Sequence, residues 1–466
     1  MEIIYINHAC LKITENGSTI LTDPWIVNLP VKATSVWKMP PVEMNPEEIL
    51  KGVDYVYISH SHEDHFHIPS LNLIPRATKI IIPVFPKHEF SREKLIHRVL
   101  KLMGFKNIIS IKAWEGIEIN KTLRIDLIPA AQSRYYDWEN SGIVISANTT
   151  KILNMNDNVP DKNLCEEIRN RYKKIDIAFI QTAGISAYPS CFEMTKKEKE
   201  NSIKNKVNDF TYQDLILDII KPRYIVPFAG DFGWFHKFQY DHNYFARATP
   251  LDLNNHIIKK GFELIPMQPS DSFTIENGLV EKEKRIDWHN YELYVSKQIS
   301  LNKNKVELYY EWLHKSKRND LFKKSLKRIS VIQKYFFNYS MGMTASICYF
   351  IKGNHSNFSI IIKSKSGKPL ELNVLKGEVT SSDQTFTLNE LIWSSIIEGK
   401  IMWNNVQWLC TIKENKPFNN DIRDLIFWLG YYIDLGSRNP EVILDSSILD
   451  QNGPLIRLNL SPKSMI

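Results

Sequence analysis

A run of three histidines and one aspartate, placed directly after an apolar strand, constrains this chain more than any other feature. His60, His62, Asp64 and His65 lie within six positions, and residues 53–58 before them are rich in β-branched and aromatic side chains. The first two histidines lie on one side of an extended backbone and can share a cation, whereas Asp64 and His65 can reach a second cation where the chain turns. A solvated polar loop is the other interpretation. The spacing favours a site for two metal ions.

The length and amino-acid composition limit the kinds of protein that this chain can be. The chain has 466 residues, more than one hydrophobic core usually holds, so we expect two domains. No apolar stretch approaches the ~20 residues of a membrane span and the N-terminus lacks a secretory signal, so we expect a soluble cytoplasmic protein. The five cysteines include no C-x-x-C pair, which argues against a disulfide framework or a thiolate cluster. The net charge of +7 is spread through lysine-rich stretches such as residues 196–206, which are typical of solvated faces, and we expect no nucleic-acid partner.

Residues 1–285 alternate short apolar strands with amphipathic segments, which is the pattern of an α/β fold. We expect strands at residues 3–6, 9–13, 19–22, 53–59, 79–83, 123–129, 142–147, 151–155, 175–181 and 224–227. We expect helices at residues 69–73, 89–102, 162–171, 196–204, 209–220 and 250–260. Polar or turn residues follow apolar runs at His60, Asp157 and Gly230, so the ends of strands are expected to assemble the site.

The charged segment 281–285 predicts a domain boundary. After it, a lysine-rich helical region to about residue 338 precedes expected strands at 346–351, 358–362 and 370–375 and expected helices at 388–398 and 420–433. Because residues 286–466 carry no metal-like cluster, we interpret them as a smaller α+β domain that shapes a substrate groove or an interface. Its aromatic residues either pack in a core or line a ligand pocket, and they are Trp403, Trp408, Phe427, Trp428, Tyr431 and Tyr432.

The H-x-H-x-D-H run resembles the motif of the metallo-β-lactamase superfamily, whose αββα sandwich carries its metals at one edge of two packed sheets. Other stretches look like the catalytic domain of CMP-N-acetylneuraminate hydroxylase and its bacterial relatives, and they are residues 7–11, 21–25, 57–60, 151–157, 221–224, 227–230 and 251–255. The likeness covers about residues 3–275. It implies an αββα metal domain in residues 1–285, followed by the smaller α+β domain in residues 286–466.

The resemblance implies roles for three further residues. Asp157 matches the family position whose carboxylate bridges two cations, although an aspartate at this place also serves as a helix N-cap. Asp23 can accept the second N–H of a ligand histidine, or it can simply form an Asp-Pro turn. His8 either faces the site or is a structural histidine.

The sequence departs from the superfamily pattern at two places. Gln132 stands where the third histidine of the first metal site would fall, so this half-site uses the Gln132 oxygen, borrows a residue such as Asp137, or keeps an open coordination position. The last superfamily histidine would fall near residues 227–236. There His236 is the first candidate ligand and Asp231 the second, and a surface histidine is the alternative interpretation of His236.

Two chemistries fit a His/Asp site for two divalent ions, which we expect to be iron or zinc. The first is hydrolysis of an ester, thioester or amide in a small-molecule or carrier-bound substrate, with Asp64 and Asp157 orienting the nucleophile and passing a proton. The second is oxygen-dependent hydroxylation of an amino-sugar or amino-acid-derived substrate at a di-iron centre. It would need an external ferredoxin or reductase, because we expect no Rieske domain in this chain. A metal-supported binding protein without catalysis is the third interpretation.

Overall fold

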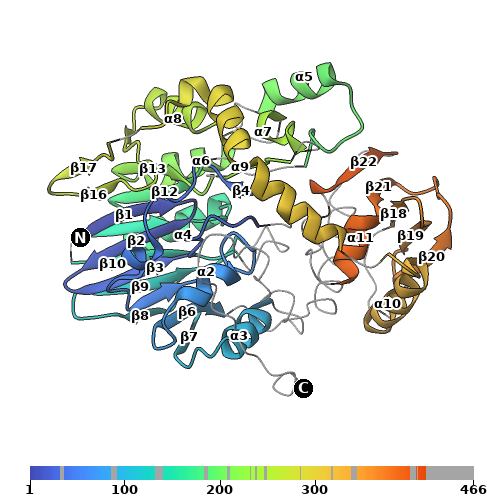
Figure 1. Cartoon of the computed structure of the whole chain (residues 1–466). Coiled ribbons are helices and arrows are strands. Elements are labelled where there is room, and N and C mark those ends of the chain that lie inside the picture. The colour runs from blue at the N-terminus through green and yellow to red at the C-terminus, as the bar shows by residue number, and fades with distance from the viewer. Residues whose placement is uncertain are drawn as a thin grey trace.

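Two β-sheets face each other in the N-terminal part of the molecule, and a third large sheet lies in the C-terminal part (Figure 1). The computed structural model describes residues 1–415 except for 32–35, 85–91, 132–139, 149, 183–186, 207–209, 231, 237–238, 246–248, 284, 316–317, 337–343, 399–405 and 407. Within these residues, no helix has the length and apolar character needed to cross a membrane.

The first sheet contains eight strands in the order β17-β16-β1-β2-β3-β5-β6-β7. Adjacent strands from β3 to β7 are parallel, whereas β1, β2 and β3 alternate in direction. The strands β1, β3 and β5 therefore all end at the same edge of the sheet. Their bounds are β17 (Gly278–Val280), β16 (Ser272–Thr274), β1 (Glu2–Asn7), β2 (Cys10–Glu15), β3 (Ser18–Thr22), β5 (Tyr55–Tyr57), β6 (Lys79–Val84) and β7 (Ile108–Lys112).

The second sheet contains seven strands in the order β15-β13-β12-β11-β10-β9-β8. The strands β11, β12, β13 and β15 are parallel, so β11 and β12 deliver the residues after them to one edge. The bounds are β15 (Glu263–Leu264), β13 (Tyr224–Phe228), β12 (Ile177–Gln181), β11 (Thr150–Asn154), β10 (Gly142–Ala147), β9 (Leu123–Ile128) and β8 (Gly116–Glu118). A short pair, β4 (Trp37–Lys38) with β14 (Phe232–Gly233), lies beside the sandwich.

Three apolar layers hold the sandwich together, because alternate side chains of each strand face opposite sides of its sheet. Ile20 and Ile145 belong to the layer between the sheets. Helices cover both outer faces, with Leu100 of α3 packed on the first sheet and Ile168 of α4 packed on the second. The helices and helical turns of this part are α1 (Pro46–Leu50), α2 (Ile68–Leu73), α3 (Arg92–Leu102), α4 (Lys162–Tyr172), α5 (Lys196–Lys206), α6 (Thr211–Leu215), η2 (Ile216–Ile220), α7 (His242–Phe245) and α8 (Pro250–Lys259).

The C-terminal part is built on a five-stranded sheet in the order β20-β19-β18-β21-β22. Its core is continuous with apolar residues of the sandwich such as Trp25 and Trp234. The backbone N–H of Glu193 also donates to the carbonyl of Ile412 at 2.9 Å. The elements are η4 (Trp288–Asn290), α9 (Tyr291–His314), α10 (Leu321–Phe336), β18 (Ala345–Lys352), β19 (Asn357–Ser364), β20 (Glu371–Lys376), β21 (Gln384–Asn389), α11 (Glu390–Ile397) and β22 (Cys410–Glu414).

The αββα sandwich predicted from the sequence is confirmed, and the predicted N-terminal strands and helices match observed elements with small shifts at their ends. The helix expected at residues 388–398 begins only at residue 390, because residues 384–389 form β21 and pair in parallel with β18. The helix expected at 420–433 lies outside the described residues, as do all of the singled-out aromatic residues except Trp408, which is buried. No described strand joins the C-terminal sheet to the sandwich sheets, and the division at residue 285 stays a prediction.

Candidate metal centre

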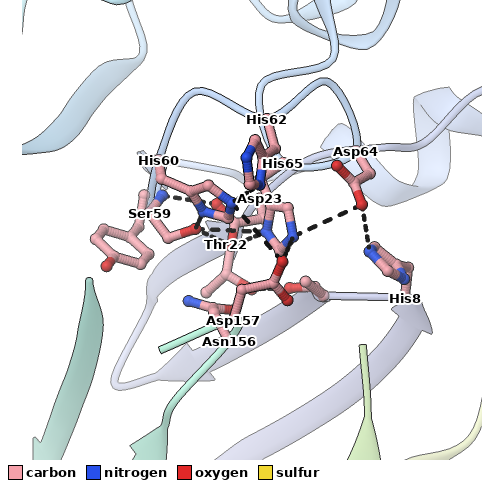
Figure 2. A network of polar contacts seen from close by, with 12 residues as sticks. His8, Thr22, Asp23, Ser59, His60, His62, Asp64, His65, Asn156 and Asp157 are labelled. Atoms are coloured by element: carbon pink, nitrogen blue, oxygen red, sulfur yellow. Dashed lines mark hydrogen bonds and ion pairs between the residues drawn. The ribbon is translucent and has the colours of Figure 1, made fainter. Parts of the chain in front are cut away.

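Polar residues from both sheets of the sandwich meet at one edge (Figure 2). His8 follows β1 and Asp23 follows β3, while the loop that begins at His60 follows β5. From the opposite sheet, Asp157 follows β11. Because parallel strands end at a common edge, residues far apart in sequence are brought within ligand distance of one another.

Three of these strand ends turn through a left-handed backbone conformation. The φ angles are 52° at His8, 35° at Asp23 and 49° at Asn156, the residue before Asp157. Residues other than glycine rarely adopt this conformation, which costs of order 1–3 kcal/mol at each position. The strain is concentrated where polar side chains are turned toward one another, as is common at functional sites.

The site contains two groups of three residues, each able to hold one metal ion. His60, His62 and Asp157 form the first group, and in it one ligand atom of each residue lies within 4.8 Å of the others. The second group meets the same criterion and consists of His8, Asp64 and His65.

One carboxylate oxygen connects the two groups. Asp157 Oδ2 lies 3.8 Å from His60 Nε2 and 3.5 Å from His65 Nε2. His8 Nε2 lies 3.4 Å from Asp64 Oδ2, while His65 Nε2 lies 4.0 Å from that oxygen. Ligand atoms around a tetrahedral ion with bonds of about 2.1 Å are about 3.4 Å apart, so most of these separations suit a shared cation.

The two histidines of the first group are closer together than two ligands of one ion. His60 Nε2 and His62 Nδ1 are 2.7 Å apart, within hydrogen-bond distance, and would separate on sharing a cation. The nitrogens that face each other are still the ones with which these rings would coordinate. His60 is buried, whereas His62 is partly exposed and has more freedom to move.

Asp23 fixes the orientation of two histidines from beneath the site. It is fully buried, and its Oδ2 lies 3.0 Å from His65 Nδ1 and accepts the Ser59 hydroxyl at 2.7 Å. Because that hydroxyl has a single proton, its oxygen must accept from His60 Nδ1, which lies 2.9 Å away. Both imidazoles therefore carry a proton on Nδ1 and turn Nε2 toward the site, which is how carboxylates orient metal ligands.

Electrostatics hold His65 and Asp157 as an ion pair. Burial alone would lower the pKa of His65, but the nearby carboxylates of Asp157 and Asp23 outweigh it and raise that pKa well above its usual value. For Asp157, burial favours the neutral acid, but the charge of His65 and a hydrogen bond from it give a net lowering of the pKa. A divalent cation would replace the proton that now balances the carboxylates.

Gln181, at the end of β12, orients the shared carboxylate and was not singled out in the sequence. Its Nε2 donates to Asp157 Oδ1 at 2.8 Å, which leaves Asp157 Oδ2 directed at the histidines. The main-chain carbonyl of Gln181 accepts a hydrogen bond from Gln213 Nε2 at 3.0 Å. The position of Gln181 at the end of a strand parallel to β11 is the pattern that could have identified it.

Four further residues were candidate ligands in the sequence, and they are His236, Gln132, Asp137 and Asp231. His236 is buried after β14, but it belongs to neither of the three-residue groups found among the described residues. Its role as a ligand stays a prediction. Gln132, Asp137 and Asp231 lie outside the described residues.

Replacing Asp23 tests whether it orients both histidines. In Asp23→Asn one acceptor oxygen becomes an NH2 group, and the single remaining oxygen cannot serve both the Ser59 backbone N–H and His65 Nδ1, so we expect zinc affinity to fall by about 10–100-fold. Ser59→Ala removes only the link to His60 and should have a smaller effect. Zinc affinity is measured by competition with a chelating dye, and circular dichroism checks that each variant is folded. Wild-type affinity in a folded Asp23→Asn would show that the carboxylate does not support the ligands.

The raised pKa of His65 predicts opposite pH trends for stability and metal affinity. The charged imidazole stabilises the metal-stripped protein fully below about pH 6.5, and this contribution is lost as the pH rises through the folded pKa. Zinc affinity should instead rise by up to about tenfold per pH unit, because binding displaces that proton. Denaturant unfolding and zinc titration over one pH series measure both quantities. Parallel trends, or trends unchanged in Asp23→Asn, would contradict the assignment.

The N-terminal part of the chain matches a known protein family. Residues 2–185 match the model of the beta-lactamase superfamily domain. The chain is 24% identical over 298 residues to the inactive cytidine monophosphate-N-acetylneuraminic acid hydroxylase of Homo sapiens, covering 61% of this chain and 56% of that protein. It is 25% identical over 297 residues to the cytidine monophosphate-N-acetylneuraminic acid hydroxylase of Pan troglodytes, covering 61% and 47%. The matched segment thus spans about half the length of these hydroxylases.

Among solved structures, the isothiocyanate hydrolase from Delia radicum gut bacteria aligns with a TM-score of 0.41 and 16% identity. The alignment covers 59% of this chain and 99% of the hydrolase. The sequence match, the two packed sheets and the histidine and aspartate residues at the sandwich edge lead to one assignment. The N-terminal sandwich of this chain belongs to the metallo-β-lactamase superfamily.

Proposed function

We propose that the chain is a metal-dependent hydrolase with two divalent ions, acting on an ester, thioester or amide of a small-molecule or carrier-bound substrate. The position of Asp157 carries the proposal, because one of its oxygens faces a histidine of each three-residue group. A carboxylate in that position can be shared by two ions. Two adjacent ions suit hydrolysis, since one can position water while the other polarises a carbonyl oxygen.

The chemistry of the ligands narrows the metals to zinc or iron. Both groups offer imidazole nitrogens and carboxylate oxygens, and neither includes a cysteine. Such mixed nitrogen and oxygen sites suit borderline divalent ions rather than calcium or magnesium, which prefer oxygen ligands alone. The five cysteines are free thiols. A reducing cytoplasm is the compartment we propose for the protein.

We assign His8, rather than His236, as the third residue of the second ion site. His8 Nε2 faces Asp64 Oδ2 at 3.4 Å, and the His8 and His65 rings meet edge to face with centroids 5.4 Å apart. His236 remains the alternative candidate for the third ligand of this ion. The first ion would be held by His60, His62 and Asp157, with a further position left for water, substrate or Gln132.

The protein's own residues would orient substrate and move protons. The bound ions would lower the pKa of a water molecule toward ~7 and polarise the substrate carbonyl. Asp64 and Asp157 would accept the proton of an attacking water and return it to the leaving group. Gln181 keeps Asp157 Oδ1 occupied, so that only Oδ2 faces the reacting atoms.

Metal stoichiometry distinguishes the two histidine assignments. We expect His8→Ala to retain about one zinc ion per chain and His236→Ala to retain about two, because His8 is a member of the second three-residue group and His236 belongs to neither group found among the described residues. Elemental analysis after dialysis gives the counts, and thermal unfolding checks the fold of each variant. The reverse pattern would transfer the ligand role to His236.

A second function, oxygen-dependent hydroxylation, is favoured by the names of the relatives. The two aligned human and chimpanzee proteins are named as hydroxylases of cytidine monophosphate-N-acetylneuraminic acid, one of them inactive. A histidine and carboxylate site can hold two iron ions as well as zinc. Under this alternative, an external ferredoxin or reductase would supply electrons and the substrate would be derived from an amino sugar or an amino acid.

Comparing zinc-loaded and iron-loaded protein separates hydrolysis from oxygenation. We expect both forms to cleave an acyl thioester and p-nitrophenyl acetate, and Asp157→Asn to lose at least about 100-fold in rate because the shared carboxylate is removed. Thiol or nitrophenol release measures hydrolysis, while an oxygen electrode with dithionite-reduced ferredoxin measures the alternative. Oxygen uptake by the iron form alone, without hydrolysis by either form, would favour the hydroxylase.

A further inference from the structure

A pocket separate from the metal centre lies where β12 and β13 of the second sheet end. Its volume is about 40 Å³, and its lining comes from β1, β13, α8, the residue after β12, the connection from β15 to β16, and η4. One water molecule needs about 10–15 Å³ of such space, so the pocket has room for about three water molecules or an organic group of similar bulk. None of the histidines and aspartates of the two metal-binding groups belongs to its lining.

Rigid apolar groups form most of the walls. Met267 and Tyr5 line the pocket and are buried. Four more lining residues are prolines, and they are Pro227, Pro250, Pro266 and Pro269. A proline ring fixes φ and carries no N–H, so these walls are preformed and offer no backbone donor. Pockets that are mostly apolar and largely preformed are typical of small-molecule sites.

Trp288 of η4 forms a partly exposed wall of the pocket, and its neighbours hold it in place. The lining residue Gln268 donates from Nε2 to the carbonyl of Ile286 at 3.0 Å and accepts the Ile286 backbone N–H at 2.7 Å. These two hydrogen bonds fix the chain just before Trp288. The indole ring also packs on the Tyr294 ring, with centroids 5.9 Å apart. The wall is therefore part of the packed structure.

Asn254 of α8 brings an unsatisfied hydrogen-bond acceptor to the pocket. Its side chain belongs to the lining, and its Oδ1 is shielded from solvent without a donor among the described residues. A buried carbonyl oxygen without a donor is costly. The other polar lining side chains are already bonded, since the Thr182 hydroxyl donates to the carbonyl of Phe228 at 3.2 Å and Gln268 is bonded as above. An occupant with an N–H group would satisfy Asn254.

We propose that this pocket binds a short acyl amide, either as a free small molecule or as the end group of a larger one. The acyl chain matches the proline-lined walls, and the amide N–H matches Asn254 Oδ1. The site does not depend on which reaction the metal centre performs.

Charged groups fit this pocket less well. No acidic or basic side chain is among the described residues that line it, so a buried charge would lack a counter-ion. The N-terminus of α8 would attract an anion, but a capping box occupies it, in which the Asp252 carboxylate accepts the Thr249 backbone N–H at 2.7 Å. Water alone would find few polar partners between the apolar walls.

The pocket lies next to the backbone that carries two residues of the metal centre. Thr182 directly follows Gln181, whose side chain orients the shared carboxylate. The backbone N–H of Thr182 donates to the carbonyl of Phe228 at 2.9 Å, and the N–H of Ala229 donates to the carbonyl of His8 at 2.9 Å. A bound amide would thus be a neighbour of the metal centre and would contact none of its ligands.

Methionine-methyl NMR of the full chain tests the proposal. The Met267 signal, assigned with Met267→Leu, reports on the pocket, and Met103, buried on the outer face of the first sheet, is the reference signal. The probes are propionamide, butanone and propionate, which have nearly the same shape but differ in the N–H donor and in charge. Asn254→Ala removes the acceptor, and Asn255→Ala, at the next and exposed position of α8, is the matched control.

We expect propionamide to shift the Met267 signal saturably without moving Met103. Butanone should bind about three- to tenfold more weakly because it has no donor, and propionate should not bind measurably. Asn254→Ala should lower the affinity for propionamide to that for butanone, whereas Asn255→Ala should keep the wild-type difference. Circular dichroism checks that each variant is folded.

A longer probe identifies the source of the amide. N-butylpropionamide carries the same acyl group on a chain that extends beyond the pocket. Binding as tight as that of propionamide indicates the end group of a larger molecule, and loss of binding indicates a free small amide. The proposal would be overturned by the absence of a saturable Met267 shift with propionamide, by equal affinities for propionamide and butanone, or by an unchanged difference between them in Asn254→Ala.

Discussion

The contact between Asp157 and the histidine loop is the interaction on which the site depends. It is a polar contact between the two sheets, since Asp157 follows a strand of one sheet and His60 and His65 follow a strand of the other. The apolar layer between the sheets sets their separation and hence this distance. A close-packed interior tolerates little change in that spacing, so the sandwich acts as a rigid support for the carboxylate.

The surroundings of this contact are arranged for cations. Four of the six residues in the two groups are buried and the other two, His62 and Asp157, are partly buried, so uncompensated carboxylates are costly there. Protonated His65 compensates them in part. Asp23 adds a further buried carboxylate. It contacts His65 Nδ1 directly and acts on His60 through the Ser59 hydroxyl, and so keeps the Nε2 atoms of both histidines directed into the site. Two divalent ions would complete the charge balance.

The sequence predicted the sandwich and the main cluster because both are encoded locally. Alternating apolar residues define strands, and the run from His60 to His65 carries its spacing within six positions. The choice between His8 and His236 could not be made in this way, because it depends on how strand ends meet in space. Gln181 was missed for the same reason. Strand β21 was not predicted, and its last two residues were assigned to the following helix, since its apolar residues continue directly into α11.

Zinc anomalous scattering from crystals of the zinc-loaded protein would test the central claim most directly. The account predicts two peaks about 3.5–4 Å apart, with an Asp157 oxygen within about 2.2 Å of each, and with His60 and His62 on one ion and His8 and His65 on the other. A single peak, or two peaks that do not share Asp157, would contradict the bridging role from which the proposed function is derived.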